Sequence, residues 1–382
     1  MKGKLLALSL LLVLGICFLK GELTAMSLFS SDFQQKYQTL FQDVEKLNEY
    51  TKANKVELKG VEVKEVDLDG AEFHGATFNK IKWKDINLEN SVFIGVVFQD
   101  CEFENSNLNG SKFIDCIFKN CKLNNTKINR ATWKNGQFLN CQIENSILNK
   151  WFGDGVVFNG GKILDTPFAE GKIQYTFKNI ELDGVQVVLT EGGVPLTVED
   201  SDLSEVDFGD SHFSDIILRR VKQSGGGVKF NDLTAKSISF EDVDMTKGTA
   251  IGRSNVGVVR ISGGRFGTAF DGSTVGRIIA RDAELSYMSF SEATLPYVEI
   301  AKCSLYDTGM WDGHIKEFLV TNSQFNVIVG ENFKADIVLW DNVTLDGKID
   351  LTNAQVKDFR PSRINRGSNL QLITTGSNMR FN

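Results

Sequence analysis

Histidine is nearly absent from this chain, which has 3 in 382 residues. His74, His212 and His314 stand far apart in sequence, and no two of them have the spacing of metal ligands. The motifs HExxH and GxSxG, the P-loop, and a GxGxxG that opens a helix are missing as well. The sequence therefore offers no metal centre, nucleophilic triad or nucleotide site, and we expect neither catalytic residues nor a cofactor.

Long apolar runs are absent after the first 20 residues, so no later segment is expected to cross a bilayer as a helix. At the start, Lys2 and Lys4 precede an apolar run, Leu5–Leu19, that ends at Lys20. This run suits the core of a signal peptide better than a spanning helix, which needs about 20 residues. We therefore predict a signal peptide at 1–21 and an extracytoplasmic protein that is periplasmic, secreted or on the cell surface; an uncleaved membrane anchor is the alternative.

Cys17 is a candidate lipidation site within this leader. Leu14 stands three residues before it, as in a lipoprotein signal, although Ile16 is bulky where such signals have a small residue. A lipid there would anchor the protein to a membrane, so a membrane contact is expected only at the N-terminus, through this lipid or through the uncleaved anchor.

A strong charge of either sign is also lacking. The chain has 42 basic and 49 acidic residues and a net charge of −7. Binding to phosphates requires clustered Lys and Arg. This mild acidic excess argues against nucleic acid or an anionic membrane surface as the partner.

What the chain has is a repeat of five residues. Every fifth residue from Leu58 is large and apolar: Leu58, Val63, Leu68, Phe73, Phe78, Trp83, Leu88, Phe93, Phe98, Phe103, Leu108, Phe113, Phe118, Leu123, Ile128, Trp133, Phe138, Ile143 and Leu148. The residue two places before each is small or β-branched, and the other three are mostly polar. This period is neither helical nor that of a plain strand.

A chain that turns a corner every five residues explains this period, because four such sides make a coil of 20 residues. The large and the small residue of each side would point inward, and successive coils would pair at the strand spacing of about 4.8 Å. Asp85, Asn105, Asn125 and Asn145 recur at intervals of 20 and are interpreted as turn residues that form side-chain ladders.

The segments AEFHG, SNLNG, SKFID and CKLNN resemble the A(D/N)Lxx signature of the pentapeptide-repeat family. The resemblance covers residues 56–150 without interruption. It implies an all-β protein, a right-handed parallel β-helix of four sides, but it does not by itself imply a function. In such a coil Phe78, Phe98, Phe118, Phe138 and Phe158 would stack as one column, and Phe73, Phe93, Phe113 and Trp133 as another.

After Trp151 the five-residue period weakens while a period of about 20 persists. We predict that 151–382 continues the solenoid with looser coils, interrupted at 151–155, 191–195 and 224–227. A second, separate β-domain is the alternative.

The first coil needs a cap, because open solenoid edges invite aggregation. Residues 22–55 are expected to supply it, with an amphipathic helix at 31–53 whose N-terminus Ser31 or Asp32 can cap. The same helix could instead bind a partner or a second copy through its apolar face, which comprises Phe33, Tyr37, Phe41, Val44 and Leu47.

Two further sets of residues are candidate sites. Cys101, Cys121 and Cys141 fall in one inward column and are expected to be inert free thiols, since parallel side chains suit the torsion of a disulfide poorly. Asp271, Arg277, Arg281, Asp282 and Asp312 could in principle serve a polysaccharide-cleaving β-helix, but a solvated face explains them more simply.

The sequence thus predicts an exported, non-enzymatic structural or interaction scaffold. Its partners would be proteins of the cell envelope, a surface layer or an appendage such as a flagellar sheath. One alternative is a DNA mimic that inhibits an enzyme such as gyrase, as some pentapeptide-repeat proteins do, although the predicted export argues against it. The other is a β-helix that binds or cleaves carbohydrate.

Overall fold

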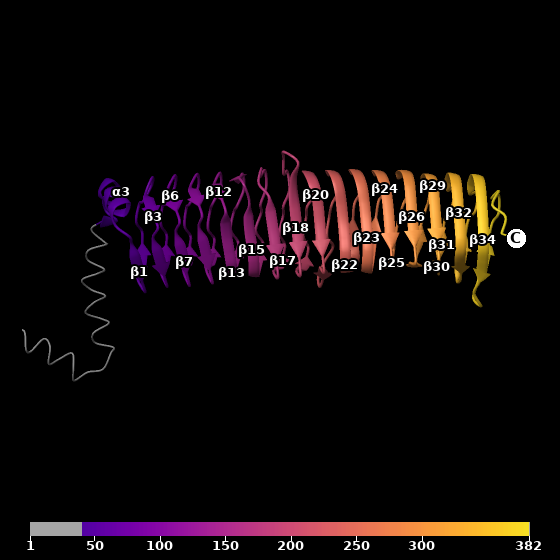
Figure 1. Ribbon diagram of the computed structural model, residues 1–382, viewed down its shortest axis with the longest axis horizontal. Coiled ribbons are helices and arrows are strands. Elements are labelled where there is room, and N and C mark those ends of the chain that lie inside the picture. Colours follow the sequence, from indigo (N-terminus) through magenta and orange to yellow (C-terminus); the bar gives the residue numbers. More distant parts are fainter. Residues whose placement is uncertain (1–39, 382) are drawn as a thin grey trace, which may run out of the picture.

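The computed structural model describes residues 40–381 as a parallel β-solenoid of about 16 turns with one short helix at its N-terminal end (Figure 1). The leader, Cys17, Phe33 and Tyr37 lie outside the described residues. At about 4.8 Å per coil the rod is roughly 75 Å long.

Three-residue strands separated by tight corners build the first coils, as the five-residue period predicts. They form three faces, each a ladder of parallel strands one coil apart. The first face has β1 (Glu57–Lys59), β4 (Thr77–Asn79), β7 (Val97–Gln99) and β10 (Ile117–Lys119); the second has β2 (Glu62–Lys64), β5 (Lys82–Lys84), β8 (Glu102–Glu104) and β11 (Lys122–Asn124); the third has β3 (Glu72–His74), β6 (Val92–Ile94), β9 (Lys112–Ile114), β12 (Thr132–Lys134) and β14 (Phe152–Gly153). The fourth side is joined by single bridges such as Asp67 to Asn87 and Asn87 to Asn107.

Further along the rod, strands of 6 to 17 residues, several of which continue around a corner, occur together with short strands of two to four residues. They are β13 (Gly136–Glu144), β15 (Val156–Leu164), β16 (Tyr175–Lys178), β17 (Glu181–Asp183), β18 (Val194–Glu199), β19 (Asp202–Ser204), β20 (His212–Arg219), β21 (Lys222–Gln223), β22 (Thr234–Ala250), β23 (Asn255–Ala269), β24 (Thr274–Arg281), β25 (Glu284–Ser286), β26 (Thr294–Ala301), β27 (Ser304–Tyr306), β28 (Thr308–Gly309), β29 (His314–Thr321), β30 (Gln324–Phe325), β31 (Ile328–Val329), β32 (Lys334–Leu345), β33 (Lys348–Asp350), β34 (Gln355–Arg366) and β35 (Gln371–Ile373). Strand pairing runs from β1 to β34 in one stack (Figure 1).

Residues 151–155 do not interrupt this stack, contrary to the sequence-based prediction. Phe152 and Gly153 pair with Thr132 and Trp133 of the coil below. Glycine at position 153 makes this pairing possible, because a Cβ on Gly153 would lie 1.8 Å from the Trp133 carbonyl oxygen. Extra residues enter instead at the two later sites, where the coil spacing is 21 (Thr176 to Thr197) and 22 (Ile217 to Ser239).

The core is a continuous column of buried side chains along the axis. Rings one coil apart stack as the periodicity predicts: the Phe98–Phe118 and Phe118–Phe138 centroids are 4.5 and 4.7 Å apart. The column continues through Phe158 to Phe177. Apolar burial on this scale is the main stabilising term of the fold.

The helix α3 (Val44–Ala53) covers the first coil. Its Asn48 accepts a hydrogen bond from the Glu72 amide and donates one to the Gly70 carbonyl, so the helix occupies the place of a preceding coil above β3. The prediction of one unbroken helix over 31–53 is wrong in its described part, because residues 41–43 are not helical. Asp43 instead caps a new helix, since its carboxylate accepts from the Lys46 amide at 3.1 Å.

Candidate functional site

The corners of the regular coils set the geometry of the surface. From Gly60 to Lys150 every fifth residue has a positive φ, between 48° and 72°. Most of these residues are Gly, Asn or Asp, the types that tolerate this conformation best. The side chains between the corners are therefore repeated in fixed positions, one coil apart.

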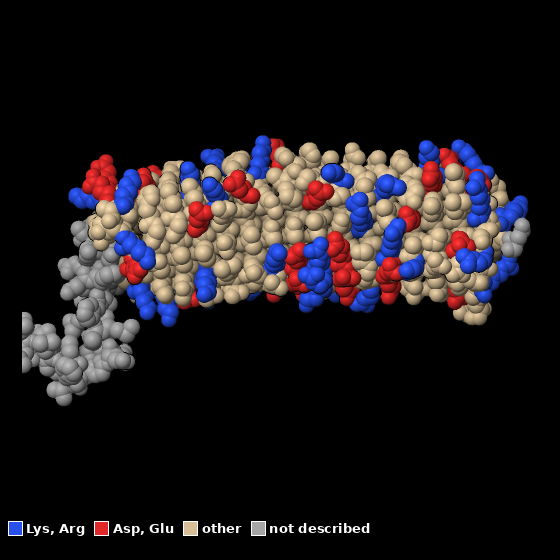
Figure 2. Space-filling model, viewed as in Figure 1, with Lys and Arg blue, Asp and Glu red and all other residues tan. Residues whose placement is uncertain are grey.

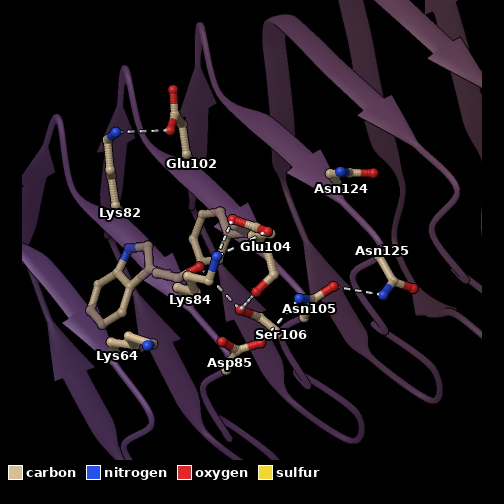
Figure 3. Close-up of polar contacts among 12 residues, drawn as sticks. Lys64, Lys82, Lys84, Asp85, Glu102, Glu104, Asn105, Ser106, Asn124 and Asn125 are labelled. Atoms are coloured by element: carbon tan, nitrogen blue, oxygen red, sulfur yellow. Dashed lines mark hydrogen bonds and ion pairs between the residues drawn. The ribbon is translucent and has the colours of Figure 1, made fainter.

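Corner side chains bond to one another along the axis. Asp85 accepts from the Asn105 amide at 3.0 Å, and Asn105 accepts from Asn125 at 2.7 Å (Figure 3). Asp100 with Asn120 and Asp115 with Asn135 repeat this arrangement. These contacts confirm that the recurring Asn and Asp residues act as turn formers and ladders.

Charged side chains on the flat faces pair across coils in the same way. Lys82 lies 3.7 Å from Glu102 and Lys84 lies 3.2 Å from Glu104 (Figure 3). Farther along, Arg219 bridges Glu199 and Glu241 at 2.9 and 2.7 Å. Figure 2 shows basic and acidic side chains next to one another near the middle of the rod. The Lys178 ammonium holds the pKa of the Glu199 carboxyl below its usual value. Much of the acidic surface is therefore neutralised by neighbouring coils.

The five cysteines of the described chain are free and buried. The thiols of Cys101, Cys121 and Cys141 each donate to a carbonyl 23 residues earlier, as Cys121 does to Phe98 at 3.3 Å. Burial raises the pKa of the Cys116 thiol to about 11, and it also raises that of Cys303. Protonated, hydrogen-bonded thiols of this kind are poor nucleophiles.

The residues weighed for polysaccharide cleavage are not gathered into one constellation. Arg281 pairs with Glu299 at 2.5 Å, and Arg277 lies 4.7 Å from the centroid of the Tyr297 ring. Asp271 accepts a hydrogen bond from Ser289. These contacts support the interpretation of a solvated face.

The three histidines lie on separate coils and point outward. His314 borders a groove near the C-terminal end, in which Asp336 lies 3.8 Å from the His314 Nε2 atom and 2.7 Å from the Lys357 ammonium. Between residues 40 and 381 no group of three or more His, Cys, Asp or Glu side chains is placed to hold a metal ion. That part of the chain also has no helix long and apolar enough to span a membrane.

The described residues of the predicted interaction helix pack inward. Phe41 and Leu47 are buried in the core, Phe41 lies 6.3 Å from the Trp83 ring, and Val44 is partly buried against the same cluster. In this position they serve the capping function. A role of the helix in binding a partner stays a prediction.

Exposed aromatic side chains on neighbouring coils escaped the sequence analysis. Tyr287, Tyr306 and Trp311 are 66%, 40% and 42% exposed. The Tyr287 amide donates to the Tyr306 carbonyl, which places the two tyrosines side by side on successive coils. Trp311 folds over Gly309, where any Cβ would clash with its ring. The signal was available in the sequence, because aromatic residues at outward positions break the pattern.

These features define a parallel β-solenoid whose coils turn on left-handed corners of Asn, Asp and Gly. Sequence profiles agree: the pentapeptide repeat region profile matches residues 93–187, and the profile of eight pentapeptide repeats matches residues 71–110. Residues 71–187 of the chain are therefore recognised as pentapeptide repeats.

Solved structures with similar folds differ widely from this chain in sequence. QnrB1, a plasmid-mediated fluoroquinolone resistance protein, is 13% identical over 53% of this chain and 84% of its own (TM-score 0.26). HetL, involved in heterocyst differentiation regulation in the cyanobacterium Nostoc sp. strain PCC 7120, is 9% identical over 65% and 93% (TM-score 0.28). The PL6 family alginate lyase AlyGC is 8% identical over 87% and 98% (TM-score 0.17). Such distant likenesses carry no argument about function, and no curated protein matches the chain in sequence.

Proposed function

We propose that the protein is an exported, non-catalytic scaffold that binds a partner protein of the cell envelope or of a surface assembly. The observation that carries the proposal is the set of three exposed aromatic side chains on neighbouring coils, Tyr287, Tyr306 and Trp311, which we call the aromatic cluster. Tyr and Trp are enriched among the residues that dominate binding energy at protein interfaces. The predicted leader, with its Lys2 and Lys4 and the run Leu5–Leu19, supports export.

The rod favours such binding because its surface costs little to organise. Side chains held by cross-coil ladders and ion pairs lose little conformational freedom when a partner binds. The aromatic cluster lies on coils that are hydrogen-bonded on both sides, between β25 and β30. A partner would therefore meet a preformed surface.

The structure gives less support to the DNA mimic. A mimic of the phosphate backbone needs rows of free carboxylates, whereas Glu102, Glu104 and Glu199 are paired with lysine or arginine across coils. Their charges are directed at neighbouring side chains rather than at a basic protein.

Cell fractionation tests the export. We expect the protein in the envelope or outside the cell, with the Leu5–Leu19 run removed or retained only as an anchor, and we expect Leu12→Arg to trap it in the cytoplasm by breaking the apolar run. Full-length protein with an intact Met1 in the cytoplasm of wild-type cells would contradict the proposal and favour the DNA mimic.

A pull-down from envelope material tests the binding surface. The variant Tyr287→Ser/Tyr306→Ser/Trp311→Ser should lose the co-purifying protein while keeping the melting temperature. Phe152→Ser/Leu189→Ser is the matched control, because it removes exposed apolar side chains of 40% and 49% exposure on other coils. Equal loss in both variants, or capture of glycan alone, would count against a protein partner at this cluster.

A further inference from the structure

The two ends of the rod differ in charge. The first coil, residues 56–75, has six acidic side chains and two basic ones, a net charge of −4. The last coil, which we call the basic end (residues 355–381), has five basic side chains (Lys357, Arg360, Arg363, Arg366 and Arg380) and one acidic one, a net charge of +4. The whole chain has a net charge of −7, so this basic end is a local feature. Figure 2 shows Lys and Arg gathered there.

The strand β34 at the basic end has an open edge. It pairs with β32 along one side, from Gln355 to Arg366, and no strand among residues 40–381 pairs with its other side. Beyond it, the Asn378 side chain bonds to the Val356 backbone, the Asn378 amide donates to the Ala354 carbonyl, and Phe381 packs on Phe359 at 5.1 Å. Much of the strand edge is therefore available to a further coil.

Apolar side chains within the basic end are only partly buried. They are Phe359, Ile364, Leu370, Leu372 and Phe381, whereas the corresponding residues of earlier coils are fully covered. The arginines Arg360 and Arg363 beside them pair with Asp358 and Asp341, and both arginine side chains remain 65% exposed. A partly apolar centre with a charged rim is the usual anatomy of a protein interface.

The open strand edges at the two ends lie on the same two faces of the rod. The first column of paired residues begins at Glu57 of β1 and, followed coil by coil, ends at Arg360 of β34. Within the described chain, β1 and β2 have strand partners only on the side of β4 and β5. A head-to-tail arrangement thus brings Glu57 of one copy toward Arg360 of another.

A polar cap against aggregation is the simpler explanation of the basic end. The two apolar columns that hold Trp340 and Leu345 end in Pro361 and Arg366 respectively, and proline and charge on an edge strand prevent pairing. This protection acts against a like edge, since two ends of +4 repel each other. It does not act against an end of opposite charge, so the same residues select between partners.

We propose that the basic end binds the acidic first coil of a second copy, so that the rods associate head to tail. Such a contact is heterologous and does not close on itself, so it leads to open assemblies. On the third face each end is already covered, by α3 above β3 and by residues 376–378 beside Gln355 and Val356. Because both covers lie on that face, successive rods are expected to be inclined to each other. This inference depends neither on export nor on the aromatic cluster.

Sedimentation of the purified protein at low and high salt tests the proposal. We expect concentration-dependent association at about 50 mM salt that weakens at about 500 mM, because screening shortens the reach of the charges. Arg360→Glu/Arg363→Glu/Arg366→Glu, which makes the basic end acidic, should weaken association at least about tenfold. Glu57→Lys/Glu62→Lys/Glu65→Lys should do the same from the other end.

Two further variants make the test specific. The six substitutions combined in one chain restore opposite charges at the two ends and should restore association. Arg220→Glu/Arg253→Glu/Arg265→Glu makes the same charge change in the middle of the rod, at arginines of 50–67% exposure, and should leave association unchanged. Circular dichroism confirms that each variant is folded.

A monomer at every concentration and salt would overturn the proposal, and so would equal loss in the mid-rod variant or no rescue by the combined variant. Chemical cross-linking supplies an independent readout. Links from Lys357 to Lys59 or Lys64 are expected, whereas links from Lys357 to the Lys357 of another copy would show a tail-to-tail contact and contradict the proposal.

Discussion

The regular coils (residues 56–150) and the looser coils (from residue 151) reach the same fold by different means. The first use three-residue strands, a left-handed corner every five residues and stacked phenyl rings. The second use strands as long as 17 residues that bend around corners, and aliphatic columns such as Ile238, Val259, Ile278 and Val298. Both keep the inward residues buried and the strands in parallel register.

Coil length follows the same division. Paired residues on the first face are 20 apart in the regular part, as in Ile117 to Gln137. In the looser part the spacing is 22 from Ile217 to Ser239, 21 from Ser239 to Arg260 and 19 from Arg260 to Ile279. The stack tolerates these changes because the residue number changes at loops, as at 224–227, or at local register shifts within a strand, as between Met245 and Thr249. An apolar inward column and parallel pairing are thus sufficient for a coil, and the strict period of five determines the shape of its corners.

The largest expected effect distinguishes the two kinds of core. Phe118→Ala removes a ring stacked on both sides and should lower the free energy of unfolding by about 3–5 kcal/mol, whereas Ile278→Val should cost about 0.5–1.5 kcal/mol. Chemical denaturation measures both. Lys119→Ala is the outward control, with an expected change within about 0.5 kcal/mol; if it were the more damaging change, the inward and outward assignments would be reversed.

Glycine substitutions test the close approach between coils. In Gly75→Ala the new Cβ enters open space, so the free energy of unfolding should fall only by the cost of placing alanine in a left-handed conformation, about 1–2 kcal/mol. At Gly161, in the first of the looser coils, a Cβ would lie 2.0 Å from the Cys141 carbonyl oxygen. Gly161→Ala should therefore cost more than Gly75→Ala, because the backbone has to move. Equal melting temperatures for the two variants would show that the coils can separate there without cost.

A smaller effect is expected from the amide ladder. Asn125→Ala removes the hydrogen bond to Asn105 and places alanine at a φ of 50°, so a loss of about 1–2 kcal/mol is expected. Asn125→Gly removes the same bond without the backbone strain. The difference between the two melting curves separates the ladder from the corner, and no difference would show that the strain at this corner is negligible.

The smallest effect concerns pH. The folded pKa of Glu199 lies below its usual value because of Lys178, so its contribution to stability is full above the unfolded pKa of about 4.3 and is lost as the pH falls through the folded value. The neutral Asn105–Asn125 bond does not titrate in this range. Hydrogen exchange below about pH 4 should therefore accelerate more around β18 and β20 than around β10; uniform acceleration would contradict this.

Most of the fold of the regular coils could be predicted from the five-residue period. The inward column from Leu58 to Leu148, the ring stacks and the Asn ladders all follow from sterics that recur in every coil. The looser coils could be predicted in outline only, because there the register depends on pairing with the coil below rather than on local residues.

Local exceptions were the part that could not be predicted. The break at residues 41–43 depends on Phe41 reaching the Trp83 ring in the second coil, a tertiary contact that no helical periodicity reports. The continuity at 151–155 depends on Gly153 fitting against the Trp133 backbone. The pairing of Arg219 with both Glu199 and Glu241 required the actual coil lengths of 20 and 22.

The direction of the hydrogen bonds gives the rod a mechanical character. Backbone bonds such as those from Thr77 to Val56 and from Val97 to Ala76 join each coil to the next, so they run along the axis of the rod rather than across it. When the two ends are pulled apart, the bonds of one coil boundary share the force. The successive boundaries are in series, so each boundary carries the whole force. The boundary with the weakest set of bonds then determines the strength of the whole rod, and separation there leaves the coils on either side intact.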